Sequence, residues 1–129
     1  MGVNKGHVRI YQNDNGTWTQ IGGDIDGEAA GDYSGYSVSL SSDGSVVAIG
    51  AHLNDGNLNN SGHVRIYQFD SVGNAWSQLG QDIDGEAAGD YSGYSVSLSS
   101  DASVVAISAV NNDGQNGGQS GHVRIYQYA

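Results

Sequence analysis

The most constraining feature of this chain is that it repeats itself. The heptapeptide GHVRIYQ occurs three times, and the stretch DIDGEAAGDYSGYSVSLSSD occurs twice, offset by 58 residues. The copies lie at Gly6–Gln12, Gly62–Gln68 and Gly121–Gln127 for the heptapeptide, and at Asp24–Asp43 and Asp82–Asp101 for the longer stretch. A fixed period of this length is typical of solenoids, propellers and other stacked arrays. The fold is therefore decided by what one unit forms.

Each unit contains four segments with strand character. SVSLS alternates small polar and apolar residues, and HVRIYQ alternates strictly. SVVAI is a nearly continuous apolar run, which suits a strand buried on both faces. The fourth segment, TWTQIG or AWSQLG, carries a tryptophan and has unevenly spaced apolar residues. The expected strands of one unit are Ser37–Ser41, Ser45–Ile49, His63–Gln68 and Ala75–Gly80, and no stretch has the apolar period of a helix.

Four strands in about 58 residues, repeated along the chain, predict an all-β fold made of β-propeller blades, each with four antiparallel strands. The chain begins and ends with a third strand, so it should hold nine strands, about two blades. We expect residues 1–22 to form strands three and four of a blade shared with another copy. Residues 23–80 should form a complete blade, and residues 81–129 strands one to three of the next.

Two blades cannot close around an axis, because propellers have at least four. We therefore expect homo-oligomerisation, in which strands one and two at the end of one copy join strands three and four at the beginning of the next. A trimer would give six blades and a tetramer eight. The duplicated third strand must then compete, swap or hang free. The alternative is an open or differently paired fragment, cut from a longer array, engineered, or encoded by a recently amplified gene.

Composition excludes several classes of function. Four basic residues against fourteen acidic residues give a net charge of −10, which argues against nucleic-acid binding because a polyanion would be repelled. The absence of cysteine excludes a disulfide scaffold and thiolate metal sites. No apolar run is long enough to predict a membrane span. The first five residues contain no apolar core of an export signal, and the localisation stays open.

The sequence GYSVSLSSDGSVVAIGA, followed by a polar loop and GHVRIYQ, resembles the FG-GAP repeat of integrin-α-type β-propellers. Tyr36 stands beside Gly35 in place of the family's phenylalanine. Ile49-Gly50-Ala51 matches the Gly-Ala ending of the second strand, without the usual proline, and Ser108 replaces Gly50 in the second unit. The resemblance covers essentially the whole chain, twice, and implies a family of repeats that is usually extracellular.

The family's calcium loop, between the first two strands, is shortened here to Ser41–Ser45. It has one carboxylate, too few for a cation that takes six or more oxygens, so the resemblance implies no calcium site there. The densest carboxylates instead link strand four to the next strand one. They are interpreted as a loop for weak binding of calcium or another ligand, or as a solvated loop with no cofactor: Asp24, Asp26, Glu28, Asp32, Asp82, Asp84, Glu86 and Asp90.

Three of the four basic residues are arginines, one on each third strand: Arg9, Arg65 and Arg124. We interpret them as structural ion pairs with an acidic segment of the same or the adjacent blade, because a half-buried arginine needs a partner. Recognition of an anionic ligand is the alternative. His7, His63 and His122 precede these arginines by two residues, and their separate blades argue against a shared metal. His52 has no copy, since Val110 takes its place, and is predicted to be incidental.

No nucleophile elbow, phosphate loop or catalytic order of serine, histidine and aspartate is present, so the chain is not expected to be an enzyme. Aromatic residues with copies in both units either stack on sugars or pack in the core and rim: Trp18, Tyr33, Tyr36, Trp76, Tyr91 and Tyr94. Two functions stay open. One is a structural repeat module that self-assembles head-to-tail into a symmetric propeller. The other is an extracellular adhesion module whose acidic face binds divalent cations, glycans or protein.

Overall fold

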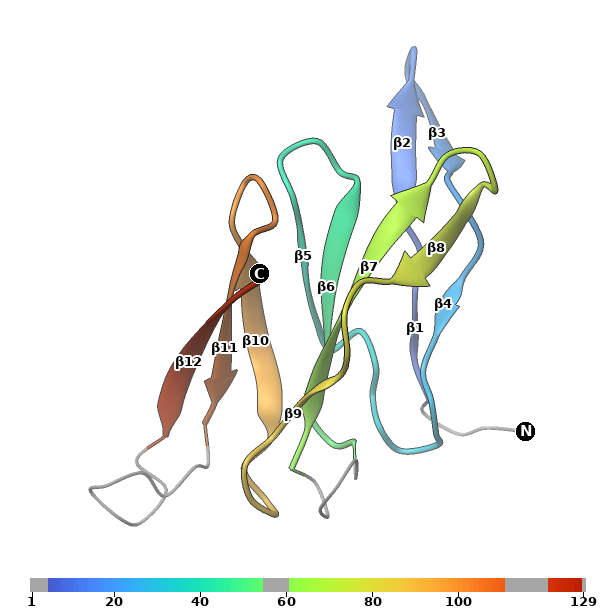
Figure 1. Ribbon diagram of the computed structural model, residues 1–129. Helices are drawn as coiled ribbons and strands as arrows, with labels where there is room; N and C mark the ends of the chain where they lie inside the picture. The colour runs from blue at the N-terminus through green and yellow to red at the C-terminus, as the bar shows by residue number, and fades with distance from the viewer. Residues whose placement is uncertain (1–4, 55–60, 111–120, 129) are drawn as a thin grey trace.

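The computed structural model describes residues 5–54, 61–110 and 121–128. These residues form twelve β-strands and no helix, so the predicted all-β class is confirmed. Figure 1 shows the strands as a row of twisted antiparallel sheets standing side by side. Within the described part of the chain there is accordingly no helix with the length and apolarity needed to span a membrane.

The middle of the row is a five-stranded sheet, which we call the central sheet. Its strands are β5 (Ser37–Leu40), β6 (Val46–Ala51), β7 (His63–Asp70), β8 (Ala75–Gln78) and the short β9 (Ile83–Asp84). The order is β5-β6-β7-β8, and β9 pairs with the beginning of β7. The first four strands are the four strands predicted for one unit.

Two further layers flank the central sheet (Figure 1). The C-terminal sheet consists of β10 (Ser92–Leu98), β11 (Val104–Ala109) and β12 (His122–Gln127), in that order. The N-terminal layer consists of β1 (His7–Val8) paired with β4 (Ile25–Asp26), and β2 (Tyr11–Asp14) paired with β3 (Thr17–Gln20). Asn15 and Gly16 form the β2–β3 turn with positive φ at both positions, as a two-residue hairpin requires.

The core lies between the layers, and β6 is buried along its whole length. Val47 and Ile49 pack with the N-terminal layer, whereas Val46 and Ala48 pack with the C-terminal sheet. The prediction that this strand is buried on both faces is therefore confirmed. Its copy β11 is buried on alternate residues only, because no described residue covers the outer face of the C-terminal sheet.

The prediction of nine strands is corrected to twelve, through two additional strands and one divided strand. The segments around Ile25 and Ile83, expected to be loops because of their charge, form β4 and β9. Each isoleucine lies opposite a valine of the third strand, Val8 or Val64, so burying that pair favours strand pairing over a solvated loop. The first GHVRIYQ copy is also divided into β1 and β2 instead of forming one strand.

Candidate functional site

Two arginines of the third strands hold an aspartate of their own repeat. Arg9 Nε lies 2.9 Å from Asp24 Oδ1, and Nη2 lies 3.0 Å from Oδ2. Arg65 holds Asp82 in the same bidentate way, at 2.8 and 3.0 Å. Hydrogen bonds from Arg9 and then Gln20 lower the pKa of Asp24 to about 2, so this pair stays ionised far below neutral pH. Paired N–H groups on a carboxylate fix its orientation as well as its charge.

A second set of ion pairs joins one repeat to the next. Arg65 Nη2 lies 3.2 Å from Glu28 Oε2 of the preceding acidic segment, and Arg124 pairs with Glu86 in the corresponding way. Arg65 thus holds two carboxylates, and its side chain is 20% exposed, whereas that of Arg9 is 45% exposed. The hydrogen bonds that Arg65 donates to Asp82 raise the pKa of Arg65. Arg65 therefore links the N-terminal acidic segment to the central sheet.

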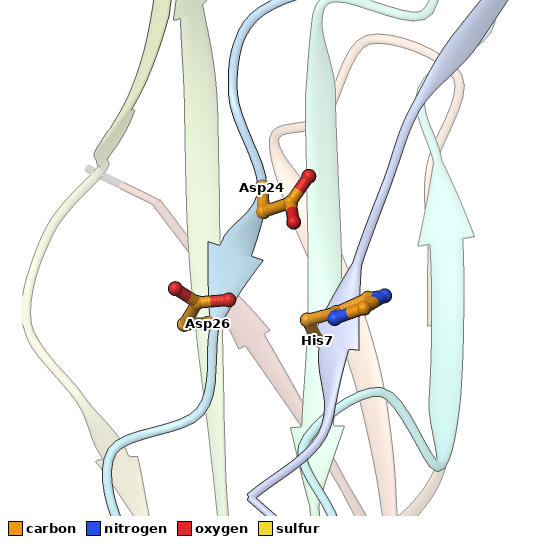
Figure 2. A group of neighbouring side chains, drawn as sticks. All are labelled: His7, Asp24 and Asp26. Atoms are coloured by element: carbon orange, nitrogen blue, oxygen red, sulfur yellow. The ribbon is translucent and has the colours of Figure 1, made fainter.

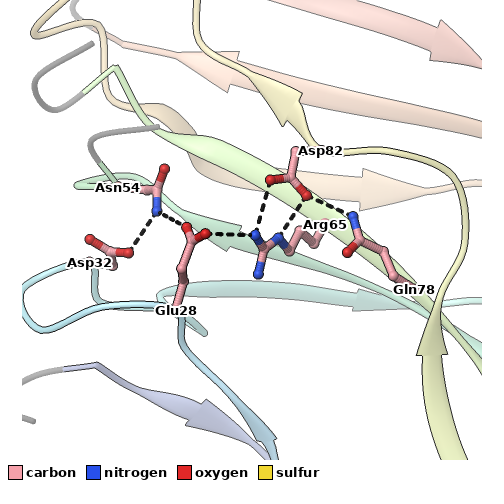
Figure 3. Close-up of polar contacts among 6 residues, drawn as sticks. All are labelled: Glu28, Asp32, Asn54, Arg65, Gln78 and Asp82. Carbon is pink, nitrogen blue, oxygen red and sulfur yellow. Dashed lines mark hydrogen bonds and ion pairs between the residues drawn. The ribbon is translucent and has the colours of Figure 1, made fainter. Parts of the chain in front are cut away.

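Asn54, which follows β6, extends this network, as Figure 3 shows. Its Nδ2 donates to Glu28 Oε1 at 2.9 Å and to Asp32 Oδ2 at 2.6 Å. Asn54 and Asp32 are both buried, and the Asn54 hydrogen bond is the main cause of the lowered pKa of Glu28. The acidic segment therefore contacts the loop after the second strand at Asn54. Asp55, Gly56 and the corresponding Asn112–Gly114 lie outside the described residues.

Replacing the doubly paired arginine, Arg65→Ala, should lower the free energy of unfolding by about 2 kcal/mol, because Asp82 and Glu28 both lose their cationic partner. Urea unfolding of the variant measures the change. Arg9→Ala is the matched control, and its exposed single pair should contribute less than about 1 kcal/mol. Equal losses in the two variants would contradict a linking role for Arg65.

Each of the first two repeats also gathers a histidine and two aspartates. Figure 2 shows His7 with Asp24 and Asp26, and the second group is His63 with Asp82 and Asp84. Strand register explains the grouping, since His7 lies opposite Asp26 and His63 opposite Asp84. In each group one ligand atom per residue lies within 4.8 Å of the others. Each histidine therefore has carboxylates of its own repeat as neighbours.

An imidazole and two carboxylates are ligand types that zinc and related cations accept. In both groups, however, one carboxylate already takes two hydrogen bonds from an arginine, so a cation would compete with Arg9 or Arg65. His63 is buried, its Nδ1 has no hydrogen-bond partner among the described residues, and burial lowers its pKa. The imidazole of His63 is therefore neutral at neutral pH.

The shortened loop between the first two strands is organised by its single carboxylate. Asp43 Oδ1 accepts hydrogen bonds from Ser41 Oγ, from the Ser45 N–H and from Ser45 Oγ, at 3.0, 3.0 and 2.7 Å. The hydrogen bonds from Ser45 and then from Ser41 lower the pKa of Asp43. Asp101 makes the same contacts in the second copy. This carboxylate closes a turn, a role that the pattern Ser-Ser-Asp-x-Ser already indicates.

His52, predicted to be incidental, lies instead at the centre of a tyrosine cluster. Its ring centroid lies 4.2 Å from that of Tyr36 and 5.4 Å from that of Tyr94, and the rings of Tyr33 and Tyr91 lie within about 6 Å. His52 is buried, and burial lowers its pKa. Tyr36 and Tyr94 also pack on each other, with ring centroids 5.2 Å apart. Comparing the two repeats does not reveal the role of His52, because the residue has no copy.

The two tryptophans occupy equivalent strands but different environments. Trp76 on β8 donates from Nε1 to the Ile21 carbonyl at 3.0 Å, and its ring lies 5.1 Å from that of Phe69. Trp18 on β3 is 67% exposed. The expectation of rim packing therefore describes Trp76 only, since Trp18 has no corresponding layer beside it among the described residues.

One comparison with known proteins bears on this arrangement. Residues 25–67, from β4 to the middle of β7, match the model of the FG-GAP repeat. No curated protein matches the chain. The matched third of the chain contains β5, β6 and their turn, and it ends within the strand that carries Arg65.

Proposed function

From the match of residues 25–67 to the FG-GAP repeat, we propose that this chain is a non-catalytic structural module that assembles head-to-tail with further copies into a closed β-propeller. The central sheet and the C-terminal sheet are then successive blades. The ion pairs described above act as links between blades. Six of the eight carboxylates in the two acidic segments are engaged in those pairs or in other hydrogen bonds with the chain, which leaves them less available for an acid–base reaction.

One observation carries the proposal. Apolar residues that are buried where the central sheet meets the C-terminal sheet have copies that are exposed on the outer faces of these two sheets. Val64 on β7 is 0% exposed, whereas its copy Val123 on β12 is 62% exposed. Leu98 on β10 is 8% exposed, whereas its copy Leu40 on β5 is 49% exposed. The outer faces thus carry the same apolar residues as the two sides of the contact between the central sheet and the C-terminal sheet. An exposed apolar patch of this kind marks an interaction surface, and the outer face of another copy would complement it as the two sheets complement each other.

The energetics fit an assembly that depends on concentration. The exposed apolar residues of the two outer faces include Val38, Leu40, Val123 and Ile125. Burying such side chains contributes about 1.5–3 kcal/mol for each that goes from full exposure to full burial. Association costs about 4–15 kcal/mol in lost translational and rotational freedom. We call the contact between two copies the joint. A joint of this size forms at high protein concentration and dissociates on dilution.

Assembly is tested by native mass spectrometry, which should show a trimer with six blades or a tetramer with eight. Val123→Asp should shift the population to folded monomer, because it places a charge at the joint and disturbs no buried contact within one copy. Val72→Asp is the matched control, since Val72 lies 96% exposed in the β7–β8 turn and the variant should assemble normally. A wild-type chain that stays monomeric at high concentration would refute the proposal.

The alternative of an adhesion module with an acidic binding face receives less support from the described residues. Six of the eight carboxylates proposed for that face make contacts with the chain itself. Asp90, for example, accepts a hydrogen bond from the Ala87 N–H at 3.1 Å. A ligand or cation would have to replace these contacts, and that cost favours the structural role.

A further inference from the structure

A groove of about 380 Å³ opens between the central sheet and the C-terminal sheet. Apolar and aromatic side chains from both sheets form most of its wall: Ile66, Leu79, Ile83, Val105, Tyr126 and Tyr128. The groove lies beside β12, on the side where the central sheet has its fourth strand, β8. The C-terminal sheet has three strands within the described residues, so its place for a fourth strand borders this groove.

One repeat earlier the corresponding space is filled by tryptophan. Ile21, Val47 and Tyr67 are the counterparts of Leu79, Val105 and Tyr126, and Trp76 packs against the cluster that they belong to. The Trp76 ring lies close to Gly22, where an added Cβ would lie 2.6 Å from the ring. A groove of this shape between neighbouring sheets is therefore built to hold the tryptophan of a fourth strand.

We propose that Trp18 of a second copy occupies this groove, with β3 of that copy pairing with β12 as the fourth strand of the C-terminal sheet. The inference rests on the head-to-tail assembly proposed above and identifies its joint. Trp18 is the counterpart of Trp76, it is 67% exposed, and the exposed β3 that carries it is the counterpart of β8.

The groove supplies each contact that Trp76 has in its own groove. The Leu79 carbonyl corresponds to the Ile21 carbonyl, which accepts the hydrogen bond from Trp76 Nε1. Gly80, at φ +79°, corresponds to Gly22 at φ +70° and likewise presents no side chain to an incoming ring. A large aromatic anchor in such a preformed pocket is the usual centre of a binding interface.

Pairing with β12 also gives Trp18 a better neighbour than it has within its own copy. Trp18 lies opposite Asn13 in the β2–β3 hairpin, whereas Trp76 lies opposite Phe69. Tyr128 follows the third HVRIYQ copy where Phe69 follows the second, so β12 offers an aromatic partner. The two third strands share the sequence HVRIYQ, which lets β3 exchange one for the other with the same backbone pairing.

Charge supports the same partner. Arg65 holds Asp82, which follows its own fourth strand, and Glu28 from the preceding repeat. Arg124 holds Glu86, which is the counterpart of Glu28 and belongs to the preceding acidic segment. The incoming β3 is followed by Asp24, the counterpart of Asp82, so the joint brings Arg124 the second carboxylate of the pattern. The partner that fits this edge of the C-terminal sheet is therefore another copy of the chain.

The test measures assembly of Trp18→Ala by analytical ultracentrifugation over a range of concentrations. We expect the dissociation constant of the joint to rise about 30-fold or more, as for a central aromatic anchor. Thermal unfolding of the dilute variant should match that of the wild type, since Trp18 is exposed within one copy. Phe69→Ala provides a control that removes an aromatic neighbour of Trp76 and should leave the joint intact if the chain stays folded.

A complementation experiment gives the proposal a second readout. Leu79→Asp damages the groove but leaves Trp18 intact, whereas Trp18→Ala leaves the groove intact. Each variant alone should be monomeric, and a mixture should form a 1:1 dimer because one intact joint remains. If the wild type assembles and Trp18→Ala assembles equally well, this inference is overturned while the proposed assembly stands. If the wild type does not assemble at all, the proposed function fails and the inference fails with it.

Discussion

Gly85→Ala is expected to destabilise the chain by about 3 kcal/mol. Gly85 follows β9, and a Cβ at this position would lie 1.9 Å from the carbonyl oxygen of Ser61. That oxygen accepts a hydrogen bond from the Ser92 N–H at 2.8 Å, and the Gly85 N–H donates to the Gly62 carbonyl at 2.8 Å. The clash is with backbone that is held on both sides, so relief requires breaking a contact between sheets.

Gly23→Ala is the matched control for this prediction. Gly23 lies just before the acidic segment of the first repeat, is exposed, and has no heavy atom within 4 Å of an added Cβ. Its substitution should change the free energy of unfolding by less than about 0.5 kcal/mol. Chemical denaturation of both variants decides the matter. A Gly85→Ala chain as stable as Gly23→Ala would mean that the approach of β9 to Ser61 is looser than the structure shows.

The strands that the sequence predicts well are those whose apolar pattern follows burial directly. The run Val46–Ile49 is continuous because neighbouring layers cover both faces of β6, and the sequence predicts the buried strand for that reason. The prediction of a loop at DIDGE is wrong because charge dominates that pattern. The single isoleucine of each link, Ile25 or Ile83, is enough to anchor a short strand on the valine of the third strand.

The contacts of the candidate site are likewise predictable from the sequence only in part. The presence of one arginine per third strand beside repeated aspartates suggests ion pairs, and the structure places Arg9 and Arg65 on Asp24 and Asp82. The sequence does not contain the distance between repeats. The ion pair between Arg65 and Glu28 of the preceding acidic segment is therefore evident only from the fold. The tyrosine cluster on His52 was out of reach because its centre breaks the repeat.

Gly50→Ser should also cost about 3 kcal/mol or more. A Cβ at Gly50 would lie 2.2 Å from the Gly93 carbonyl oxygen and 2.4 Å from Ser37 Oγ, where β6 meets β10. Ser37 Oγ already donates to that carbonyl at 2.8 Å, so neither group can yield freely. The variant makes the first repeat identical to the second at this position, and urea unfolding should show the loss. Full stability would contradict the close approach of the two sheets.

The reciprocal change, Ser108→Gly, should act on assembly in the opposite direction. Ser108 on β11 is the copy of Gly50, and its hydroxyl bonds to the Ser95 N–H and Ser95 Oγ, both at 3.0 Å, within the C-terminal sheet. Losing these bonds should cost a single copy about 1 kcal/mol. In a ring whose joint repeats the β6–β10 contact, however, Ser108 would meet Gly35 of the next copy as Gly50 meets Gly93. Removing its side chain should therefore lower the dissociation constant of the joint about tenfold, measured by ultracentrifugation beside the wild type. Weaker assembly of Ser108→Gly would mean that copies meet through a contact unlike the one between the central and C-terminal sheets.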